Sequence, residues 1–114
     1  MEIGVDCINI SRFKRSRLLN NSNLERIFSK KEIEYCKNKE NPSQHYAVRF
    51  AAKEAIIKAF FAYEMKIKHN KIEILNNKNG LPFVKIIDDC FKTFDIKISL
   101  SHSKEIALAF VIIV

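Results

Sequence analysis

Two carboxylates, Asp6 and Glu54, stand in segments that are otherwise apolar. Asp6 interrupts a stretch rich in β-branched residues that predicts a strand over 2–10, where β-propensity and desolvation both oppose an unpaired charge. Glu54 lies within the longest predicted helix. Proteins usually hold Mg²⁺ with one or two carboxylates, while water and phosphate oxygens complete its shell. The two residues therefore predict a magnesium site. The alternative for Asp6 is a strand-end residue in contact with water.

The long helix, expected over 43–64, carries its charges at different angles. At about 100° per residue from Arg49, Lys53 falls at about 40°, Glu54 at about 140° and Lys58 at about 180°. Apolar residues fill most of the remaining circumference, which predicts a largely buried helix. Ionised groups in such a helix need partners or a ligand. The simpler alternative is an i,i+4 ion pair between Glu54 and Lys58, which contributes only about 0.2–0.5 kcal/mol on an exposed helix.

A histidine and a basic segment could also contribute to binding. His102 lies between two predicted strands, where its ring could donate to a phosphate, pair with a carboxylate or face solvent at a turn. His45 and His69 have no partner pattern and are expected at the surface. The basic run Arg12, Lys14, Arg15 and Arg17 is either a solvated helix face or a docking patch for an acidic partner.

The elements that must position these residues follow from periodicity and capping. Ser29 with Glu32 forms a capping-box pattern that opens a helix ending near Asn38, and Asn41-Pro42 is typical of a helix start. Strands are expected over 2–10, 71–75, 82–87, 96–100 and 106–114, with one or two short helices within 11–28 and a helical turn within 88–94. This order predicts an α+β fold in one domain, 1–114, with one long buried helix packed on a mainly antiparallel sheet.

Composition limits the classes of protein. The 114 residues carry a net charge of +7 and are 47% hydrophobic, as in a folded domain with an anionic partner: nucleic acid, a membrane surface, a phosphorylated cofactor or an acidic protein. Two glycines exclude a P-loop and a dinucleotide-binding fingerprint. The three cysteines form no CxxC motif and are expected to be buried, reduced thiols. No secretory signal is readable and the apolar stretch 106–114 is too short to span a membrane, so we expect a cytoplasmic protein without membrane insertion.

Several separated motifs match one family in the same order. They are Gly4-Val5-Asp6 with Arg12 six residues on, the block from Arg49 to Ala59 (RFAAKEAIIKA), Asn79-Gly80-Leu81-Pro82 and Ser99-Leu100-Ser101-His102-Ser103. With them the chain resembles the holo-[acyl-carrier-protein] synthases, which belong to the 4′-phosphopantetheinyl transferases. The resemblance extends over essentially the whole chain, and the central block is its most specific part.

The resemblance implies transfer of 4′-phosphopantetheine from coenzyme A to a serine of an acyl carrier protein, with release of adenosine 3′,5′-bisphosphate, in support of fatty acid biosynthesis. Asp6 and Glu54 would be the Mg²⁺ ligands and, with Lys58, the catalytic residues. Lys58 would contact the phosphates, together with Arg49 or Lys53, and His102 would lie at the coenzyme A site. Arg12 and Arg17 would meet the acidic carrier protein. Family members are typically homotrimers with active sites between subunits. The general base stays open among Glu54, Asp6 acting through a water, and a water on the metal.

One segment departs from the family pattern. The family has a Gly-Thr-Gly segment soon after the Lys-Ala step, whereas Lys58-Ala59 is followed here by Phe60-Phe61-Ala62-Tyr63-Glu64. Either the helix continues and the loop is rebuilt, or coenzyme A binding is weakened, as in a catalytically weakened paralogue. A small basic nucleic-acid-binding module is the alternative from another class, and it leaves Asp6 and Glu54 without a role.

Overall fold

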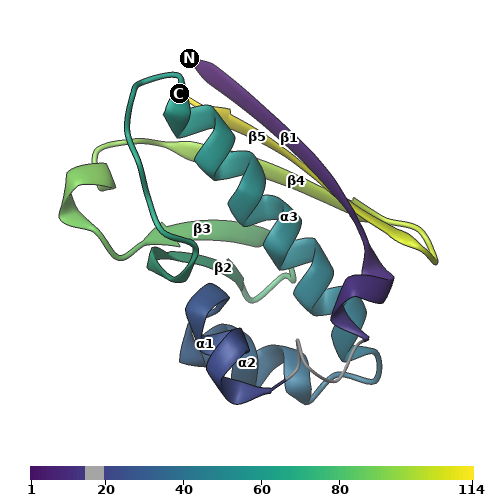
Figure 1. The fold of residues 1–114 in the computed structure, drawn as a ribbon. Helices are drawn as coiled ribbons and strands as arrows, with labels where there is room; N and C mark the ends of the chain where they lie inside the picture. The colour runs from purple at the N-terminus through teal and green to yellow at the C-terminus, as the bar shows by residue number, and fades with distance from the viewer. Residues whose placement is uncertain (15–19) are drawn as a thin grey trace.

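The computed structural model describes residues 1–14 and 20–114, and its elements follow the predicted order (Figure 1). The strands are β1 (Glu2–Asn9), β2 (Ile72–Asn76), β3 (Pro82–Ile86), β4 (Ile96–His102) and β5 (Ile106–Ile113). The α-helices are α1 (Asn21–Ile27), α2 (Lys30–Lys37) and α3 (Pro42–Phe61). Short 3₁₀ helices cover Ile10–Phe13, His69–Lys71 and Asp89–Phe91. None of the helices described is long and apolar enough to cross a membrane.

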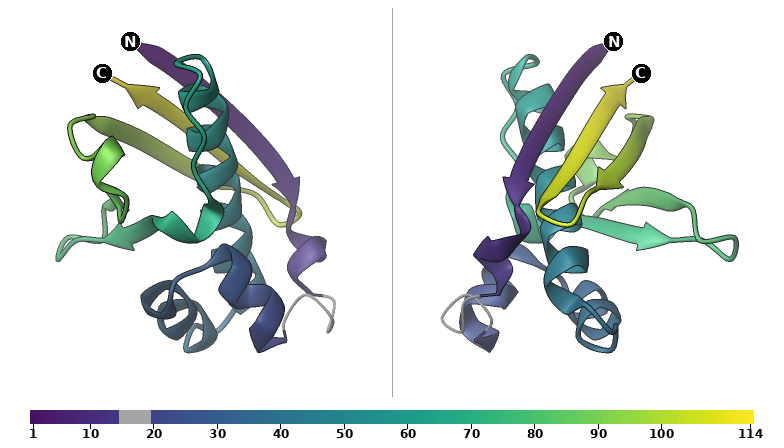
Figure 2. Two further views of the ribbon diagram at one scale, coloured as in Figure 1. Left: turned by 60° about the vertical axis from the view of Figure 1, so that its left-hand side comes forward. Right: turned by 90° about the vertical axis from the view of Figure 1, so that its right-hand side faces the viewer.

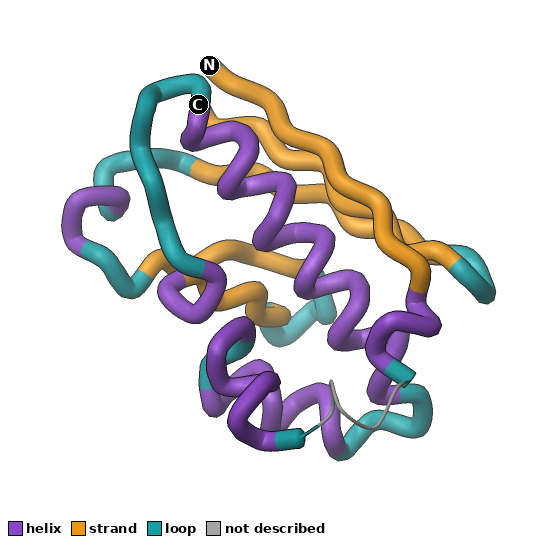
Figure 3. The backbone as a smooth tube through the Cα atoms, in the orientation of Figure 1, coloured by secondary structure: helices purple, strands orange, loops and turns teal. Residues whose placement is uncertain are grey.

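The strands form two antiparallel sheets beside one long helix. Strands β1, β5 and β4 form a sheet in that order, and β2 and β3 form a separate hairpin. Helix α3 packs on β1 and β5, with the hairpin further round its circumference (Figures 1 and 2). The tube in Figure 3 shows all the strands beside α3, and α1 and α2 near its N-terminal end. The predicted α+β fold is confirmed.

Helix α3 is buried on most of its circumference, as its sequence predicts. Ala51, Ala52, Ala55, Ile56, Ala59 and Phe60 have no exposed surface. Strand β1 approaches the helix so closely that a Cβ added at Gly4 would overlap the carbonyl oxygen of Ala55. Gly4 thus lets β1 lie against α3, two residues before Asp6.

A buried ion pair joins α3 to α2 and to the β2 segment. The Lys53 ammonium has no exposed surface, lies 2.6 Å from the Glu32 carboxylate and donates to the carbonyl oxygens of Ile27, His69 and Ile72. Glu32 also completes the predicted capping box with Ser29 and accepts from the backbone N–H of Ile74. Because each buried charge is paired and hydrogen-bonded, the core tolerates both.

Most element ends fall within a residue of the sequence prediction, but the ends of α3 and β4 differ by more. Helix α3 ends at Phe61 instead of 64, because Glu64 adopts the left-handed conformation (φ +58°). The backbone N–H groups of Glu64 and Met65 then donate to the carbonyl oxygens of Phe61 and Phe60, which is the Schellman pattern that normally uses glycine. The second difference is that His102 is the last residue of β4 and does not lie in the following turn.

The cysteines are free, but only Cys36 is buried. Cys7 and Cys90 are exposed, so the expectation of buried thiols was wrong for these two. Burial raises the pKa of the Cys36 thiol to about 12, which keeps it protonated at neutral pH. Cys7 faces outward because neighbouring side chains of a strand point to opposite faces and Asp6 points towards α3.

Candidate active site

Asp6 and Lys58 meet where β1 crosses the C-terminal half of α3. The Lys58 ammonium lies 2.8 Å from Oδ1 of Asp6 and donates to the Val5 carbonyl oxygen at 3.2 Å. The Asp6 side chain is 18% exposed and that of Lys58 is 57% exposed. The hydrogen bond to Asp6 is the largest of the effects that raise the pKa of Lys58, so the ammonium is held in its charged form.

Glu54 lies one helical turn before Lys58 on the same side of α3. Its negative charge also raises the pKa of Lys58, but the ammonium bonds to Asp6 and not to Glu54. The predicted i,i+4 pair is therefore replaced by a contact between strand and helix. The Glu54 side chain is 32% exposed and its Oε2 lies 3.6 Å from Nε2 of His69. Both predicted carboxylates thus lie close to one exposed lysine.

The donor set at this face fits Mg²⁺ better than a metal that needs a closed protein cage. No group of three or more His, Cys, Asp and Glu side chains that could hold a metal occurs in the described ranges 1–14 and 20–114. Mg²⁺ requires only one or two carboxylates and leaves its other positions to water and phosphate. The Lys58 ammonium at Asp6 shows that a cation is accommodated at this point.

Arg49 and His102 line a second place, a cavity of about 290 Å³ near the N-terminal half of α3. Arg49 is nearly buried and donates to Oδ1 of Asn76 at 2.6 Å, and its guanidinium lies 4.2 Å from the centre of the Tyr35 ring. The Gln44 side-chain amide lies 3.0 Å from Nε2 of His102. The structure therefore brings two of the three predicted cofactor-binding residues to one cavity.

The cavity has a positive character. Burial lowers the pKa of His45 there, and the charges of Arg49, Lys39 and His102 lower it further. Nε of Arg49 is buried and has no hydrogen-bond partner among the residues described. A cavity with a cationic guanidinium and an unused donor suits an anionic group such as a phosphate. The expectation that His45 lies at the surface was wrong, because it is half-buried and lines this cavity.

The two places lie on different sides of α3. Arg49 and Lys58 are nine residues apart, which places them about 180° apart around the helix and about 13 Å apart along it. Their contacts agree, since Arg49 bonds to Asn76 of β2 whereas Lys58 bonds to Asp6 of β1. Lys58, the third predicted cofactor-binding residue, is therefore not at the Arg49–His102 cavity of the same chain.

Lys53 is not available to a phosphate. Its ammonium is fully buried against Glu32 and three carbonyl oxygens, so the suggestion that it serves the cofactor was wrong. Its helical angle, close to that of Arg49, gave no sign of this because the partner Glu32 lies 21 residues away in the sequence.

Arg12 lies near the carboxylate face, with its guanidinium 5.3 Å from the centre of the Phe50 ring. Arg17, the other residue predicted to contact the carrier protein, falls in 15–19, outside the described residues.

The Phe50 ring also stacks on the imidazole of His69, at 5.5 Å between centres and 3° between planes. The His69 side chain is 32% exposed, and no sequence motif signalled its contact with Glu54.

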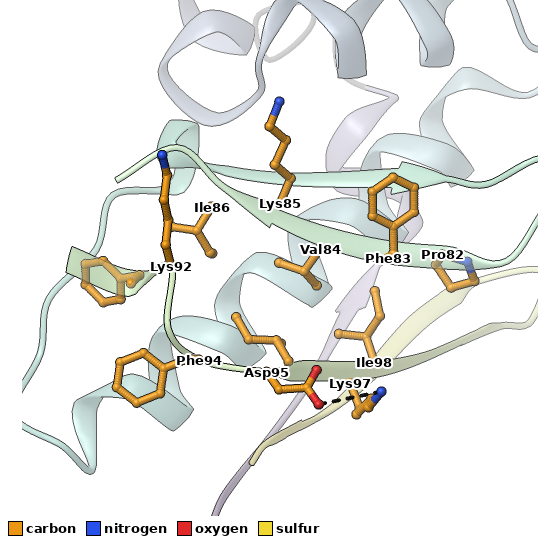
Figure 4. A pocket seen from close by; sticks show the side chains of 12 residues that line it. Pro82, Phe83, Val84, Lys85, Ile86, Lys92, Phe94, Asp95, Lys97 and Ile98 are labelled. Atoms are coloured by element: carbon orange, nitrogen blue, oxygen red, sulfur yellow. Dashed lines mark ion pairs between the residues drawn. The ribbon is translucent and has the colours of Figure 1, made fainter. Parts of the chain in front are cut away.

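A further cavity, of about 580 Å³, opens between β3 and β4 (Figure 4). Val84, Ile86, Ile96 and Ile98 contribute apolar walls, and Lys97 forms an ion pair with Asp95 there. None of the site residues predicted from the sequence lines it. The chemistry of the molecule is therefore concentrated at the two places beside α3.

Known proteins match this chain over nearly its whole length. Residues 2–111 match the family model of the 4′-phosphopantetheinyl transferase superfamily. A holo-[acyl-carrier-protein] synthase of Chloroherpeton thalassium is 44% identical, over 99% of this chain and 97% of the relative, and one of Cytophaga hutchinsonii is 41% identical, over 96% and 94%.

Among solved structures, the holo-(acyl-carrier-protein) synthase of Bacillus anthracis in complex with CoA (3′,5′-ADP) is 30% identical with a TM-score of 0.79 and covers 98% of this chain and 94% of its own. The Helicobacter pylori holo-[acyl-carrier-protein] synthase in complex with coenzyme A is 26% identical with the same TM-score, over 98% and 99%. The fold, the ordered motifs and these matches agree, and the chain belongs to the 4′-phosphopantetheinyl transferase superfamily.

Proposed function

We propose that this chain is a holo-[acyl-carrier-protein] synthase. It transfers the 4′-phosphopantetheine group from coenzyme A to a serine hydroxyl of apo acyl carrier protein, depends on Mg²⁺ and releases adenosine 3′,5′-bisphosphate. The observation that carries the proposal is the meeting of Asp6, Glu54 and Lys58 at one face, because two carboxylates beside a lysine suit a divalent cation and a phosphate. The relatives at 44% and 41% identity bear the same name.

Asp6 and Glu54 are the proposed ligands of Mg²⁺. When bound, the ion would supply Lewis-acid stabilisation of the charge that develops on the pyrophosphate. Asp6 comes from a strand held against the helix at Gly4, and Glu54 comes from the helix itself. Both ligands therefore start from rigid elements, which favours a fixed separation.

The reaction forms a bond from the serine oxygen to the β-phosphorus of coenzyme A and breaks the bond from that phosphorus to the bridging oxygen, which leaves with adenosine 3′,5′-bisphosphate. The serine proton must pass to a base, for which Glu54 and Asp6 are the protein candidates. Lys58 is the proposed phosphate contact and adds fixed positive charge where negative charge spreads in the transition state. Its exposed ammonium can turn from Asp6 towards a bound phosphate.

Arg49 and His102 are the proposed contacts to the adenosine-phosphate end of coenzyme A. Their shared cavity, its positive character and the unused donor of Arg49 support this assignment. The solved Bacillus anthracis relative is in complex with CoA (3′,5′-ADP), and the Helicobacter pylori relative is in complex with coenzyme A. The chain leaves α3 through a Schellman turn at Glu64 without the glycine segment of the family pattern, so the segment after Ala59 is rebuilt.

The active sites are proposed to lie between the subunits of a homotrimer. Arg49 and Lys58 face opposite sides of α3. One coenzyme A can therefore contact an Arg49 and a Lys58 more readily when the two residues come from neighbouring chains. The face of the β1–β5 sheet turned away from α3 supports assembly, because it exposes a row of apolar side chains to solvent. These are Ile3, Val5, Ile106, Leu108 and Phe110.

Arg12 and Arg17 are the proposed contacts to the acidic carrier protein. The position of Arg12 above Phe50 places it beside the face that holds Glu54, where an incoming serine must arrive. The reaction would serve fatty acid biosynthesis in the cytoplasm.

The proposal is tested by incubating the purified chain with coenzyme A, Mg²⁺ and the apo carrier protein of the same organism, followed by intact-mass spectrometry. We expect the carrier protein to gain one phosphopantetheine group, and EDTA to abolish the gain. No gain in mass, while an established synthase labels the same carrier protein, would contradict the proposal.

A further inference from the structure

His69 links the buried core to the carboxylate face. Its imidazole stacks on Phe50 with the two ring planes 3° apart, and its Nε2 lies 3.6 Å from Oε2 of Glu54. This separation is slightly longer than a hydrogen bond. Nε2 is buried and makes no hydrogen bond within the part of the chain that the structure describes. The Glu54 carboxylate is the charged group that faces it.

The backbone beneath His69 is held from the core. The buried Lys53 ammonium donates to the His69 carbonyl oxygen at 2.9 Å and to the Ile72 carbonyl oxygen that follows the same turn. Phe50 and Lys53 both lie within the turn of α3 that leads to Glu54. The ring is therefore fixed from two directions, by stacking on its flat face and by the anchor at its backbone.

We propose that His69 is a positioning residue for Glu54. Its Nε2–H donates to one carboxylate oxygen of Glu54 after a small rotation of either side chain, and it leaves the other oxygen free to bind a divalent cation together with Asp6. The inference rests on the proposed function, because it takes Glu54 as a metal ligand. Carboxylates that bind metals are commonly held by such a second hydrogen bond.

The geometry separates this role from two others. His69 is not placed as a third metal ligand, because its Nε2 points at Glu54 and no set of three ligating side chains occurs in residues 1–14 and 20–114. It is not merely a core side chain, because its donor atom is directed at the partly exposed carboxylate of Glu54.

The experiment measures Mn²⁺ binding to the full chain by electron paramagnetic resonance, without coenzyme A or carrier protein, alongside thermal unfolding of the metal-free protein. His69→Phe keeps a flat ring on Phe50 but removes the donor, and we expect it to weaken Mn²⁺ binding about 10-fold or more. His69→Gln retains a donor near the position of Nε2 and is expected to bind Mn²⁺ within about 3-fold of the wild type, since its hydrogen bond is kept. His69→Leu is a second variant without a donor and should resemble His69→Phe.

Mn²⁺ binding by folded His69→Phe or His69→Leu at the wild-type affinity would overturn the inference. So would a loss in His69→Gln as large as that in His69→Phe. If the wild-type chain transfers phosphopantetheine but the Glu54→Gln variant binds Mn²⁺ with the wild-type affinity, the inference is overturned and the transferase activity stands. A wild-type chain without transfer would instead overturn the proposed function.

Discussion

Lys53 and Lys58 lie five residues apart on α3, yet their surroundings differ completely. Lys53 has no exposed surface, and burial lowers its pKa while the pairing with Glu32 opposes that shift. Lys58 is 57% exposed, and its hydrogen bond to Asp6 raises its pKa. The first ammonium donates to groups that join segments of the fold, whereas the second is exposed and can turn from Asp6 to a ligand. One helix therefore carries, on neighbouring turns, a lysine that stabilises the fold and a lysine that is available to a ligand.

The largest expected effect is on stability, from Lys53→Met. The substitution leaves Glu32 buried without its partner, and breaking a buried ion pair in this way costs about 3–5 kcal/mol. Urea unfolding followed by circular dichroism measures the loss. The double variant Lys53→Met/Glu32→Met should recover part of it, but not all, because Glu32 also caps α2 and accepts from Ile74. A loss below about 1 kcal/mol in the single variant would remove the contrast between the two lysines.

Lys58→Met should have the opposite profile. We expect stability to change by less than about 1 kcal/mol, because exposed ion pairs contribute little. Transfer should fall about 100-fold, because a positive charge at the phosphates is lost. Lys92→Met is the matched control, since Lys92 forms an exposed ion pair with Asp89 away from both candidate places. Equal activity of the Lys58 and Lys92 variants would contradict the assigned role.

The raised pKa of Lys58 sets the direction of a pH effect. A group whose pKa is raised in the folded chain stays protonated at pH values where it would lose its proton in the unfolded chain. The stabilisation from the Asp6 contact is thus complete below the ordinary lysine pKa of about 10.4, and it is lost as the pH rises above that value. Transfer rates of the wild type should therefore show no loss from Lys58 up to about pH 10, measured at each pH with the carrier protein in excess.

The smallest expected effect concerns the end of α3 beyond both lysines. Glu64→Gly should stabilise the chain by about 1 kcal/mol, because glycine adopts the left-handed conformation without the steric cost that Glu64 bears. Thermal unfolding measures the gain in stability. Glu64→Ala is the comparison, because alanine keeps the Cβ and with it the steric cost of the left-handed conformation. A destabilised glycine variant would show that Glu64 makes a compensating contact.

The sequence predicted most of the helices and strands, and it predicted that several of the candidate site residues lie on α3. The capping box at Ser29 is confirmed in both of its hydrogen bonds, and Pro42 begins α3, although the Asn41 side chain makes no capping bond. Asp6 and Glu54 could be selected because charges are costly in apolar segments, and that cost is visible without a structure.

The rest depended on contacts between distant segments. Lys53 could not be assigned to the core from its helical angle, since only the fold brings Glu32 to it. His69 was missed because it sits in a connection without periodicity and meets Glu54 only after the chain has returned along α3. The end of α3 was placed too late because a glutamate occupies a backbone conformation that normally signals itself by glycine.

The central claim is that the Asp6–Glu54–Lys58 face carries out phosphopantetheine transfer. Its most direct test is a time course of carrier-protein mass for the wild type, Glu54→Gln and the exposed control Glu34→Gln, each with coenzyme A and Mg²⁺. We predict that Glu34→Gln transfers at the wild-type rate, and that Glu54→Gln remains folded but loses transfer by at least about 100-fold. Glu54→Gln with the wild-type rate would contradict the account.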